Sequence, residues 1–313
     1  MKKILVTGAT GQIGGDLISE LSRIYGKDKV IGSARRKDPL DLDCNRYYSM
    51  DCRNLDDFYR IVKEEKVDKI LHLAAILADK GEEDPNLLWD INVNGLYNAL
   101  EVSKEIGASL FVPSSIGAFG PSTPKDKTPQ NTIQRPTTAY GVSKVTGELL
   151  CDYYHQKYGL DTRGVRFPGL ISHKTLPGGG TTDYAVHIYY EAIKNKHYTS
   201  FIDKGTYMDM MYMPDAIDSI IKLMEADPDK LIDRNAFNVS SMSFEPEDIK
   251  RSIQKYIPEF TMDYDVDPVR QSIADSWPNS LDTSQAKLQW GFKPRYDLDA
   301  MTKDMLDNLK NKI

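Results

Sequence analysis

Tyr140 and Lys144, four residues apart, are the residues of this sequence whose types and spacing best suit acid–base chemistry. On a helix this spacing brings both side chains to one face, one turn apart. A phenol has a pKa of about 10 and is a poor base at neutral pH, but a neighbouring ammonium group favours the phenolate. Tyr140 could then exchange a proton with a substrate hydroxyl or carbonyl group, and Ser115 could bind the same oxygen. The alternative without catalysis is that the tyrosine and the lysine simply lie on the solvent-exposed face of an amphipathic helix.

A glycine-rich turn lies between a short apolar run and a helical pattern at the start of the chain. The apolar run covers 4–6, and apolar residues recur at helical spacing from Ile13 onward. Gly8 permits a tight turn, Gly11 lets the backbone approach a pyrophosphate, and Gly14 lets the helix pack close to the sheet. Unpaired N–H groups and the dipole at the helix start favour the anion. The segment therefore predicts a dinucleotide site that includes Gly8, Gly11, Gln12, Ile13 and Gly14.

Strand-like and helix-like segments alternate through the first half of the chain. Helical spacing predicts helices over 55–64, 87–104 and 139–158, and apolar runs predict strands over 29–34, 47–50, 69–73, 110–113 and 162–167. This alternation indicates an α/β fold, a Rossmann-type doubly wound parallel sheet with helices on both faces. We expect a dinucleotide-binding domain over 1–175 and a smaller C-terminal lobe over 176–313. The lobe is expected to bind mainly the substrate, with some of its elements returning to the sheet.

Composition and charge argue against several classes of partner. The net charge of −6 disfavours nucleic acid or an anionic membrane, and the sequence lacks a run of about 18 apolar residues that could span a membrane. We therefore expect a cytoplasmic protein that acts on a small molecule. Cys44, Cys52 and Cys151 are odd in number and lack the CxxC spacing of metal sites, so neither a disulfide framework nor a metal site is expected.

Several motifs, taken together, resemble those of a known enzyme family. The glycine-rich turn, Leu73-Ala74-Ala75, Asn92, Ser114-Ser115 and the Tyr140–Lys144 pair resemble the extended short-chain dehydrogenase/reductases. Over essentially its whole length, the chain further resembles the L-threonine 3-dehydrogenases of the sugar-epimerase-like type. The segments 176–185, 210–216 and 270–278 carry this closer resemblance, and 166–169 resembles the family's turn beside the nicotinamide.

The resemblance implies an oxidoreductase that converts L-threonine to L-2-amino-3-oxobutanoate with hydride transfer to a nicotinamide cofactor. Tyr140 would take the hydroxyl proton, Lys144 would lower the tyrosine pKa and hold the nicotinamide ribose, and Ser115 would orient the substrate oxygen. Cofactor contacts beyond the glycine-rich turn are expected at Arg35, Arg36, Asp51, Cys52, Leu73, Ala74, Ala75, Asn92, Tyr140, Lys144, Phe167 and Pro168. Substrate contacts are expected at Ser115, Tyr140, Gly180, Thr181, Thr182, Asp183 and Trp277.

Two positions depart from the family pattern. About 20 residues after the glycine motif the family carries an aspartate that binds the ribose hydroxyls, whereas this chain has Ala34 followed by Arg35 and Arg36. The two arginines could pair with a 2′-phosphate, so the local chemistry favours NADP, while the family favours NAD. The loop over 76–82 also lacks the usual serine near the substrate, and Ala78 stands near its place.

Two other activities are compatible with the motifs. A nucleotide-sugar epimerase or dehydratase would share the fold and the Tyr140–Lys144 pair. It would, however, need a roomy and basic pocket for a diphosphate, whereas the segment after Leu176 is glycine-rich and acidic. A non-catalytic nucleotide-sensing protein on the same scaffold is the third alternative, and it would not require an intact Ser115, Tyr140 and Lys144.

Individual residues also have structural interpretations. Asp183 could hold the substrate ammonium group or cap the helix that begins at Tyr184, and Trp277 could belong to the core instead of the pocket. The resemblance implies a homodimer formed through the long helices around 87–104 and 139–158, although burial against the protein's own sheet is the alternative. Candidate residues for the dimer face are Phe58 and Tyr59, or Leu96, Leu100, Leu149 and Tyr153.

Overall fold

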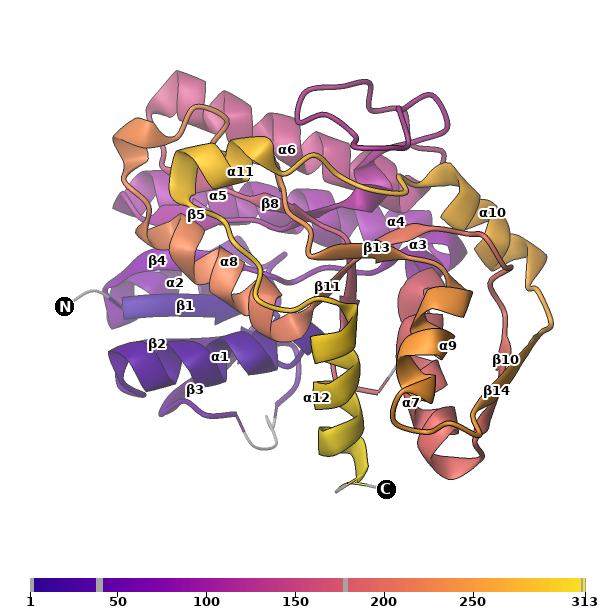
Figure 1. The fold of residues 1–313 in the computed structure, drawn as a ribbon. Coiled ribbons are helices and arrows are strands. Elements are labelled where there is room, and N and C mark those ends of the chain that lie inside the picture. Colours follow the sequence, from indigo (N-terminus) through magenta and orange to yellow (C-terminus); the bar gives the residue numbers. More distant parts are fainter. Residues whose placement is uncertain (1–2, 38–41, 177–179, 311, 313) are drawn as a thin grey trace.

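The centre of the computed structural model is a parallel sheet of six strands (Figure 1). The structure describes residues 3–37, 42–176, 180–310 and 312. The strands of the sheet are β1 Lys3–Thr7, β2 Val30–Ala34, β3 Arg46–Ser49, β4 Val67–His72, β5 Ser109–Phe111 and β7 Thr162–Arg163. They lie in the order β3-β2-β1-β4-β5-β7, and every adjoining pair is parallel. This topology confirms the predicted Rossmann-type α/β fold, and the direction in which strands are added reverses between β1 and β4.

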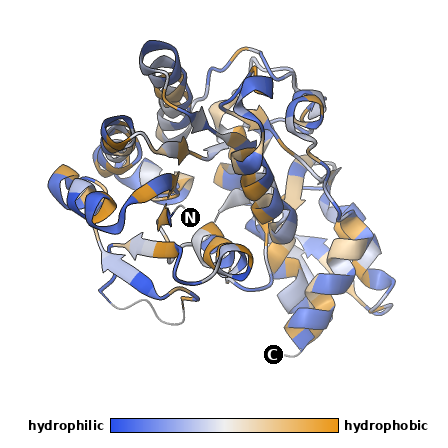
Figure 2. Cartoon of the chain, turned by 90° about the vertical axis from the view of Figure 1, so that its left-hand side faces the viewer, coloured by the Kyte–Doolittle hydropathy of each residue, from blue (hydrophilic) through white to orange (hydrophobic). Residues whose placement is uncertain are grey.

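Helices cover both faces of the sheet because its strands are apolar on both sides. Leu5 and Val6, which point to opposite faces of β1, are both fully buried. The covering helices turn hydrophobic residues inward and hydrophilic residues outward (Figure 2). One face packs against α1 Gln12–Tyr25 and α8 Met213–Glu225, and the other against α2 Leu55–Glu65, α5 Gly95–Ile106 and α6 Ala139–Tyr158.

The C-terminal half builds a second apolar core and also adds elements to the first. Its small sheets contain β9 Gly169–Ile171, β11 Met208–Tyr212 and β13 Met242–Phe244, and β10 His197–Ser200 with β14 Thr261–Tyr264. The second core is packed by α7 Tyr184–Lys194, α9 Pro246–Gln254, α10 Pro268–Ser276 and α12 Leu298–Lys310. The first core also receives α8 and α11 Ser284–Trp290. Elements from both halves of the sequence therefore meet above the carboxyl edge of the central sheet.

The segment expected as a helix over 87–104 is helical throughout, but it is not a regular α-helix. It consists of α4 Pro85–Trp89, a π-helix over Asp90–Asn94, and α5. The wider π turn contains Asn92, whose amide binds both the N–H and the C=O of Ile76, at 2.8 and 3.0 Å. Because single π turns occur mostly at functional sites, this interruption draws attention to the loop that follows β4.

The strand expected over 162–167 is also interrupted. It breaks at Gly164, where a Cβ atom would lie only 2.4 Å from the carbonyl oxygen of Val112. Beyond the break, β8 Val165–Phe167 pairs with two short strands, β6 Ser114–Ser115 and β12 Phe237–Asn238. The segment expected as a loop over 76–82 contains a short helix, α3 Ala78–Glu83. These irregular elements lie beyond the carboxyl ends of the strands, where parallel sheets bind ligands.

Candidate active site

The helix α6 starts next to Tyr140 and is capped from two directions. Thr138 caps its first turn, and Glu82 Oε1, from α3, accepts a hydrogen bond of 3.3 Å from the Tyr140 N–H. One turn later, Lys144 Nζ lies 5.4 Å from the centre of the Tyr140 ring. The same Nζ donates to the carbonyl oxygen of Pro113 at 3.0 Å. The helix therefore holds the tyrosine and the lysine on one face, with the ammonium group over the phenol ring.

Ser115 approaches the tyrosine from β6. Its hydroxyl accepts a hydrogen bond of 3.1 Å from the Gly117 N–H and caps a 3-10 helix over Ile116–Ala118. A Cβ atom on Gly117 would lie 3.0 Å from Tyr140 Cε1 and 3.5 Å from Ser115 Oγ, so a larger residue would crowd the ring. Ser115 and Tyr140 therefore meet at Gly117. The structure brings together the three residues for which the sequence predicts chemistry.

The glycine-rich turn has the tight geometry that a dinucleotide site requires. Gly8 has a φ of +67°, and a Cβ atom there would lie 2.7 Å from the carbonyl carbon of Leu73. A Cβ on Gly14 would lie 2.4 Å from the Gly8 carbonyl oxygen, so α1 packs directly on the turn. Gly11 starts α1, and within the described residues no side chain caps that helix. The tight glycine-rich turn and the N–H groups in the first turn of α1, which have no partners within the helix, fit a pyrophosphate.

At the end of β2, the structure presents arginines where the family carries an acid. Arg35 and Arg36 are exposed, and their carbonyl oxygens accept hydrogen bonds from hydroxyl groups on β3. Hydrogen bonds from Arg53 hold the pKa of Asp51 below its ordinary value, and the charge of Arg35 lowers it further. Burial raises the pKa of the neighbouring Cys52 thiol to about 11, so it stays protonated. The place predicted for the adenosine ribose therefore has two exposed arginines, Arg35 and Arg36, and the ionised Asp51, which is paired with Arg53.

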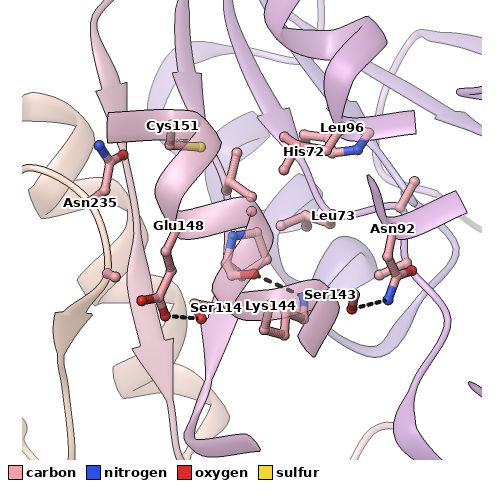
Figure 3. A pocket seen from close by; sticks show the side chains of 16 residues that line it. His72, Leu73, Asn92, Leu96, Ser114, Ser143, Lys144, Glu148, Cys151 and Asn235 are labelled. Atoms are coloured by element: carbon pink, nitrogen blue, oxygen red, sulfur yellow. Dashed lines mark hydrogen bonds between the residues drawn. The ribbon is translucent and has the colours of Figure 1, made fainter. Parts of the chain in front are cut away.

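Between β4, α5 and α6 lies a small cavity of about 30 Å³ (Figure 3). Its lining includes Leu73, Ala74, Ala75, Asn92, Ser114, Ser143, Lys144 and Glu148. Two buried atoms of the lining, His72 Nε2 and Asn235 Oδ1, have no hydrogen-bond partner among the described residues. Burial, reinforced by the charge of Lys144, lowers the pKa of His72 to about 4. The imidazole is therefore neutral at physiological pH, and Lys144 supplies the positive charge beside it.

The expected substrate segment lies beside the turn that follows β8. Thr181–Asp183 forms a 3-10 helix, and Asp183 Oδ2 accepts a hydrogen bond of 2.8 Å from the Gly180 N–H. A Cβ atom on Gly169 would lie 2.8 Å from Thr182 Cγ2, so this segment packs closely on the chain just after Phe167 and Pro168. Pro177 and the first two glycines of the predicted loop, Gly178 and Gly179, lie outside the described residues. In the described part of the chain, Asp183 therefore caps the 3-10 helix through Gly180, whereas its side chain makes no capping hydrogen bond to α7, the helix for which the cap was predicted.

Trp277 lies at the end of α10 and packs against Ile116 and Phe119, the residues around the 3-10 helix that follows Ser115. It also packs against the second core. The side chain is half-buried. It therefore links the C-terminal half to the segment that holds Ser115.

Some residues of this region were not predicted from the sequence. His72 stands directly before the Leu73-Ala74-Ala75 motif, at the end of a strand, and that position was a usable signal. Glu148 follows Lys144 at the same four-residue spacing that identified the pair, but its partners come from distant segments. Glu82 caps α6 from a helix that the sequence did not predict.

Within the described residues, no group of three or more His, Cys, Asp or Glu side chains is arranged to hold a metal ion. No helix in the described part of the chain is both long and apolar enough to cross a membrane.

Comparison with known proteins identifies the family. A model described as the NAD dependent epimerase/dehydratase family matches residues 4–240. An uncharacterized epimerase/dehydratase of Staphylococcus aureus (strain USA300) is 56% identical over 314 residues, which cover 100% of this chain and 98% of the relative. These matches confirm the predicted family.

Two solved structures of threonine dehydrogenases are similar to this chain over nearly its whole length. The L-threonine dehydrogenase of Clostridium difficile is 60% identical with a TM-score of 0.98, and the match covers 100% of this chain and 98% of that one. A GalE-like L-threonine dehydrogenase from Cupriavidus necator is 44% identical with a TM-score of 0.95, over 98% and 99% of the two chains. They confirm the predicted resemblance to threonine dehydrogenases and support a nicotinamide-dependent oxidoreductase. The chain belongs to the NAD dependent epimerase/dehydratase family of extended short-chain dehydrogenase/reductases.

Proposed function

We propose that the protein oxidises L-threonine to L-2-amino-3-oxobutanoate with transfer of a hydride to a nicotinamide cofactor. The main support is the convergence of Ser115, Tyr140 and Lys144 beyond the carboxyl ends of the strands, near the glycine-rich turn. The choice of substrate is supported by the solved relatives that are named L-threonine dehydrogenases. The packing of Thr181–Asp183 beside Gly169 brings two hydroxyl groups and a carboxylate near the site, and these groups are suited to bind an amino acid.

In the proposed reaction Tyr140 is the base. The Lys144 ammonium stabilises the phenolate, which takes the proton from the threonine hydroxyl. The Ser115 hydroxyl donates a hydrogen bond to the same oxygen and fixes its position. When bound, the nicotinamide cofactor accepts the hydride that leaves Cβ of threonine. One proton and one hydride leave the alcohol, which becomes a ketone.

Isotope transfer tests this proposal. L-threonine deuterated at Cβ should give a deuterated reduced cofactor and a product with the mass of L-2-amino-3-oxobutanoate, both followed by mass spectrometry. Threonine deuterated at the methyl group is the control, because its label should stay in the amino-acid product. A reduced cofactor without deuterium, or no product from threonine, contradicts the proposed reaction.

We further propose that the cofactor is held by the first turn of α1 and by the arginines after β2. Arg35 and Arg36 are exposed cations at the place where the family carries an acid, and Ala34 has no group that could bind a ribose hydroxyl. A guanidinium group pairs well with a phosphate through charge-assisted hydrogen bonds. NADP is therefore the proposed preferred cofactor, with NAD as the alternative.

Asp183→Asn separates substrate binding from helix capping. An amide can still accept the hydrogen bond from the Gly180 N–H, but it loses the charge proposed to face the substrate ammonium group. We expect the KM for L-threonine to rise about tenfold, the loss of roughly 1.4 kcal/mol. Steady-state kinetics measure this. Asp227→Asn is the control, because Asp227 caps another 3-10 helix, over Pro228–Lys230, through the Asp229 N–H. An unchanged KM in Asp183→Asn means that Asp183 acts only as a cap.

We also propose a homodimer through the outer face of α6. Phe58, Leu96 and Leu100 are fully or almost fully buried in the protein's own core and cannot form that face. Leu149 and Tyr153 are 63% and 50% exposed, and Tyr97 and Val142 on α5 and α6 are exposed as well. The proposed face is therefore Tyr97, Val142, Leu149 and Tyr153. Exposed apolar groups on two neighbouring helices suit a protein interface.

Leu149→Glu tests the dimer. A charge at the centre of an apolar contact should disrupt it, because the carboxylate would lose its hydration on association. We expect the parent to elute at twice the mass of the chain in light-scattering chromatography and the variant to shift toward the monomer. Leu288→Glu, at a 77% exposed leucine on α11, should leave the mass unchanged. A monomeric parent at micromolar concentration refutes the proposed interface.

A further inference from the structure

Glu148 is a buried carboxylate on α6, the helix that carries Tyr140 and Lys144. It accepts more hydrogen bonds from other side chains than a residue needs in order to be part of a helix. It lies one turn after Lys144 and two turns after Tyr140, and it is only 7% exposed. Arg166 donates to it twice, from Nε at 3.0 Å and from Nη2 at 2.8 Å. Gln134 Nε2 donates at 2.7 Å, and the Ser114 hydroxyl donates to Oε1 (Figure 3). Both carboxylate oxygens are therefore saturated by donors from three other segments.

Arg166 extends this contact beyond α6. Its guanidinium is buried and lies 5.0 Å from the centre of the Phe119 ring. Nη1 donates to the Gln130 carbonyl oxygen at 2.8 Å and to Asn238 Oδ1 at 3.1 Å. The ion pair thus connects α6 to β8 and β12, and to the long loop that contains Gln130 and Gln134. Every guanidinium nitrogen has an acceptor.

Strand β6 depends on these contacts. It contains only Ser114 and Ser115, which pair with Arg166 and Phe167 of β8. So short a strand has few hydrogen bonds of its own to fix its position. The side chain of Ser114 binds Glu148, and its backbone pairs with the residue that binds the same carboxylate. Ser115 is therefore tied to α6, the helix that carries Tyr140, by two routes that both pass through Glu148, in addition to the hydrogen bond from Lys144 Nζ to the neighbouring Pro113.

A buried ion pair is an inefficient way to stabilise a fold. Both groups lose their hydration, and apolar residues of the same volume often serve stability equally well. A network that instead joins one catalytic element to another has a clear use in positioning, because small displacements of reacting groups cost large factors in rate. The geometry of Glu148 fits this second use.

We propose that Glu148 is a positioning residue: together with Ser114 and Arg166, it sets the place of Ser115 relative to Tyr140. The inference about turnover rests on the proposed dehydrogenase function, whereas the inference about geometry does not. Glu148 itself does not touch the substrate in this proposal, so its loss should lower kcat without weakening binding.

Glu148→Gln tests the proposal with almost no change in size. An amide offers one acceptor and one NH2 group where four donors now converge. Whichever way the amide turns, its NH2 group faces an N–H of Arg166, so the contact with β8 must shift. The matched control is Glu65→Gln. Glu65 is equally buried and binds Lys3 and Arg46, at the amino ends of the strands and away from the site.

Four measurements on the parent and both variants decide the matter: Tm, cofactor Kd by fluorescence, kcat and KM with L-threonine, and the crystal structure. We expect both variants to have a lower Tm than the parent. In Glu148→Gln alone we expect kcat to fall about ten- to a hundredfold, with the KM and the cofactor Kd within about threefold of the parent. Its crystal structure should show Ser115 displaced relative to Tyr140.

The proposal is overturned if Glu148→Gln has the kcat of Glu65→Gln and an unmoved Ser115. A fall in kcat that is matched in Glu65→Gln also overturns it, since the effect would follow stability alone. If the parent itself does not oxidise threonine, the proposed function fails. The crystal structures still decide whether Glu148 positions Ser115.

Discussion

Tyr140→Phe is expected to lower turnover by about a hundred- to ten-thousand-fold, the usual contribution of a general base. The substitution removes only the phenolic oxygen. The ring keeps its contacts because it is 8% exposed and packs against Gly117, where the backbone fits closely around it. Cofactor binding should persist, since the glycine-rich turn and the Lys144 amine are unchanged. Steady-state rates and fluorescence titration with reduced cofactor measure the two properties separately.

Tyr158→Phe is the matched control for this prediction. Tyr158 ends the same helix, is 47% exposed and lies far along α6 from the site. Its loss of a hydroxyl should leave turnover within about twofold, because a surface substitution away from the site has little effect. Turnover of Tyr140→Phe within a few-fold of the parent would show that another group, or a water molecule, takes the substrate proton.

Cofactor preference is the second large expected effect. Here the residues after β2 favour NADP, whereas the resemblance to the family implies NAD. We expect the parent to prefer NADP by roughly ten- to a hundredfold in kcat/KM, because Arg35 and Arg36 offer charge-assisted contacts to a 2′-phosphate. Ala34→Asp should reverse the preference, since a carboxylate repels the phosphate and binds the free ribose hydroxyls of NAD. The specificity constants of both enzymes for both cofactors are the measurement.

The control for the cofactor prediction removes the cations without adding the acid. Replacing Arg35 and Arg36 together by alanine should abolish the preference for NADP while leaving the rate with NAD nearly unchanged. A parent that strongly prefers NAD would mean that the two guanidinium groups point away from the ribose and only cover the adenine.

The parts of this protein that sequence reasoning predicted are those set by local spacing. The four-residue step from Tyr140 to Lys144 fixes a shared helix face, and the spacing of Gly8, Gly11 and Gly14 fixes a turn in which larger residues would clash with backbone at Gly8 and Gly14. Both depend on backbone geometry within a single strand–turn–helix or helix. Neighbouring residues therefore specify most of this geometry, although the backbone of Leu73 also limits the space at Gly8.

The parts that were not predicted depend on contacts between distant segments. The π-helix over Asp90–Asn94 coincides with hydrogen bonds between the Asn92 amide and the backbone of Ile76, which no hydrophobic pattern records. At the break, Gly164 lies so close to Val112, which follows β5, that a Cβ atom would be 2.4 Å from the Val112 carbonyl oxygen. Glu148 and Arg166 are 18 residues apart in the sequence and become an ion pair only when β8 packs against α6.

The most direct test of the proposed function is the absorbance of reduced nicotinamide when the purified protein is mixed with L-threonine and either NADP or NAD. We predict reduced cofactor with L-threonine, formed faster from NADP than from NAD. A nucleotide sugar under the same conditions should give neither a reduced cofactor nor an epimerised sugar. No reduction with L-threonine and either cofactor, together with conversion of the nucleotide sugar, would contradict the threonine dehydrogenase and favour an epimerase or dehydratase.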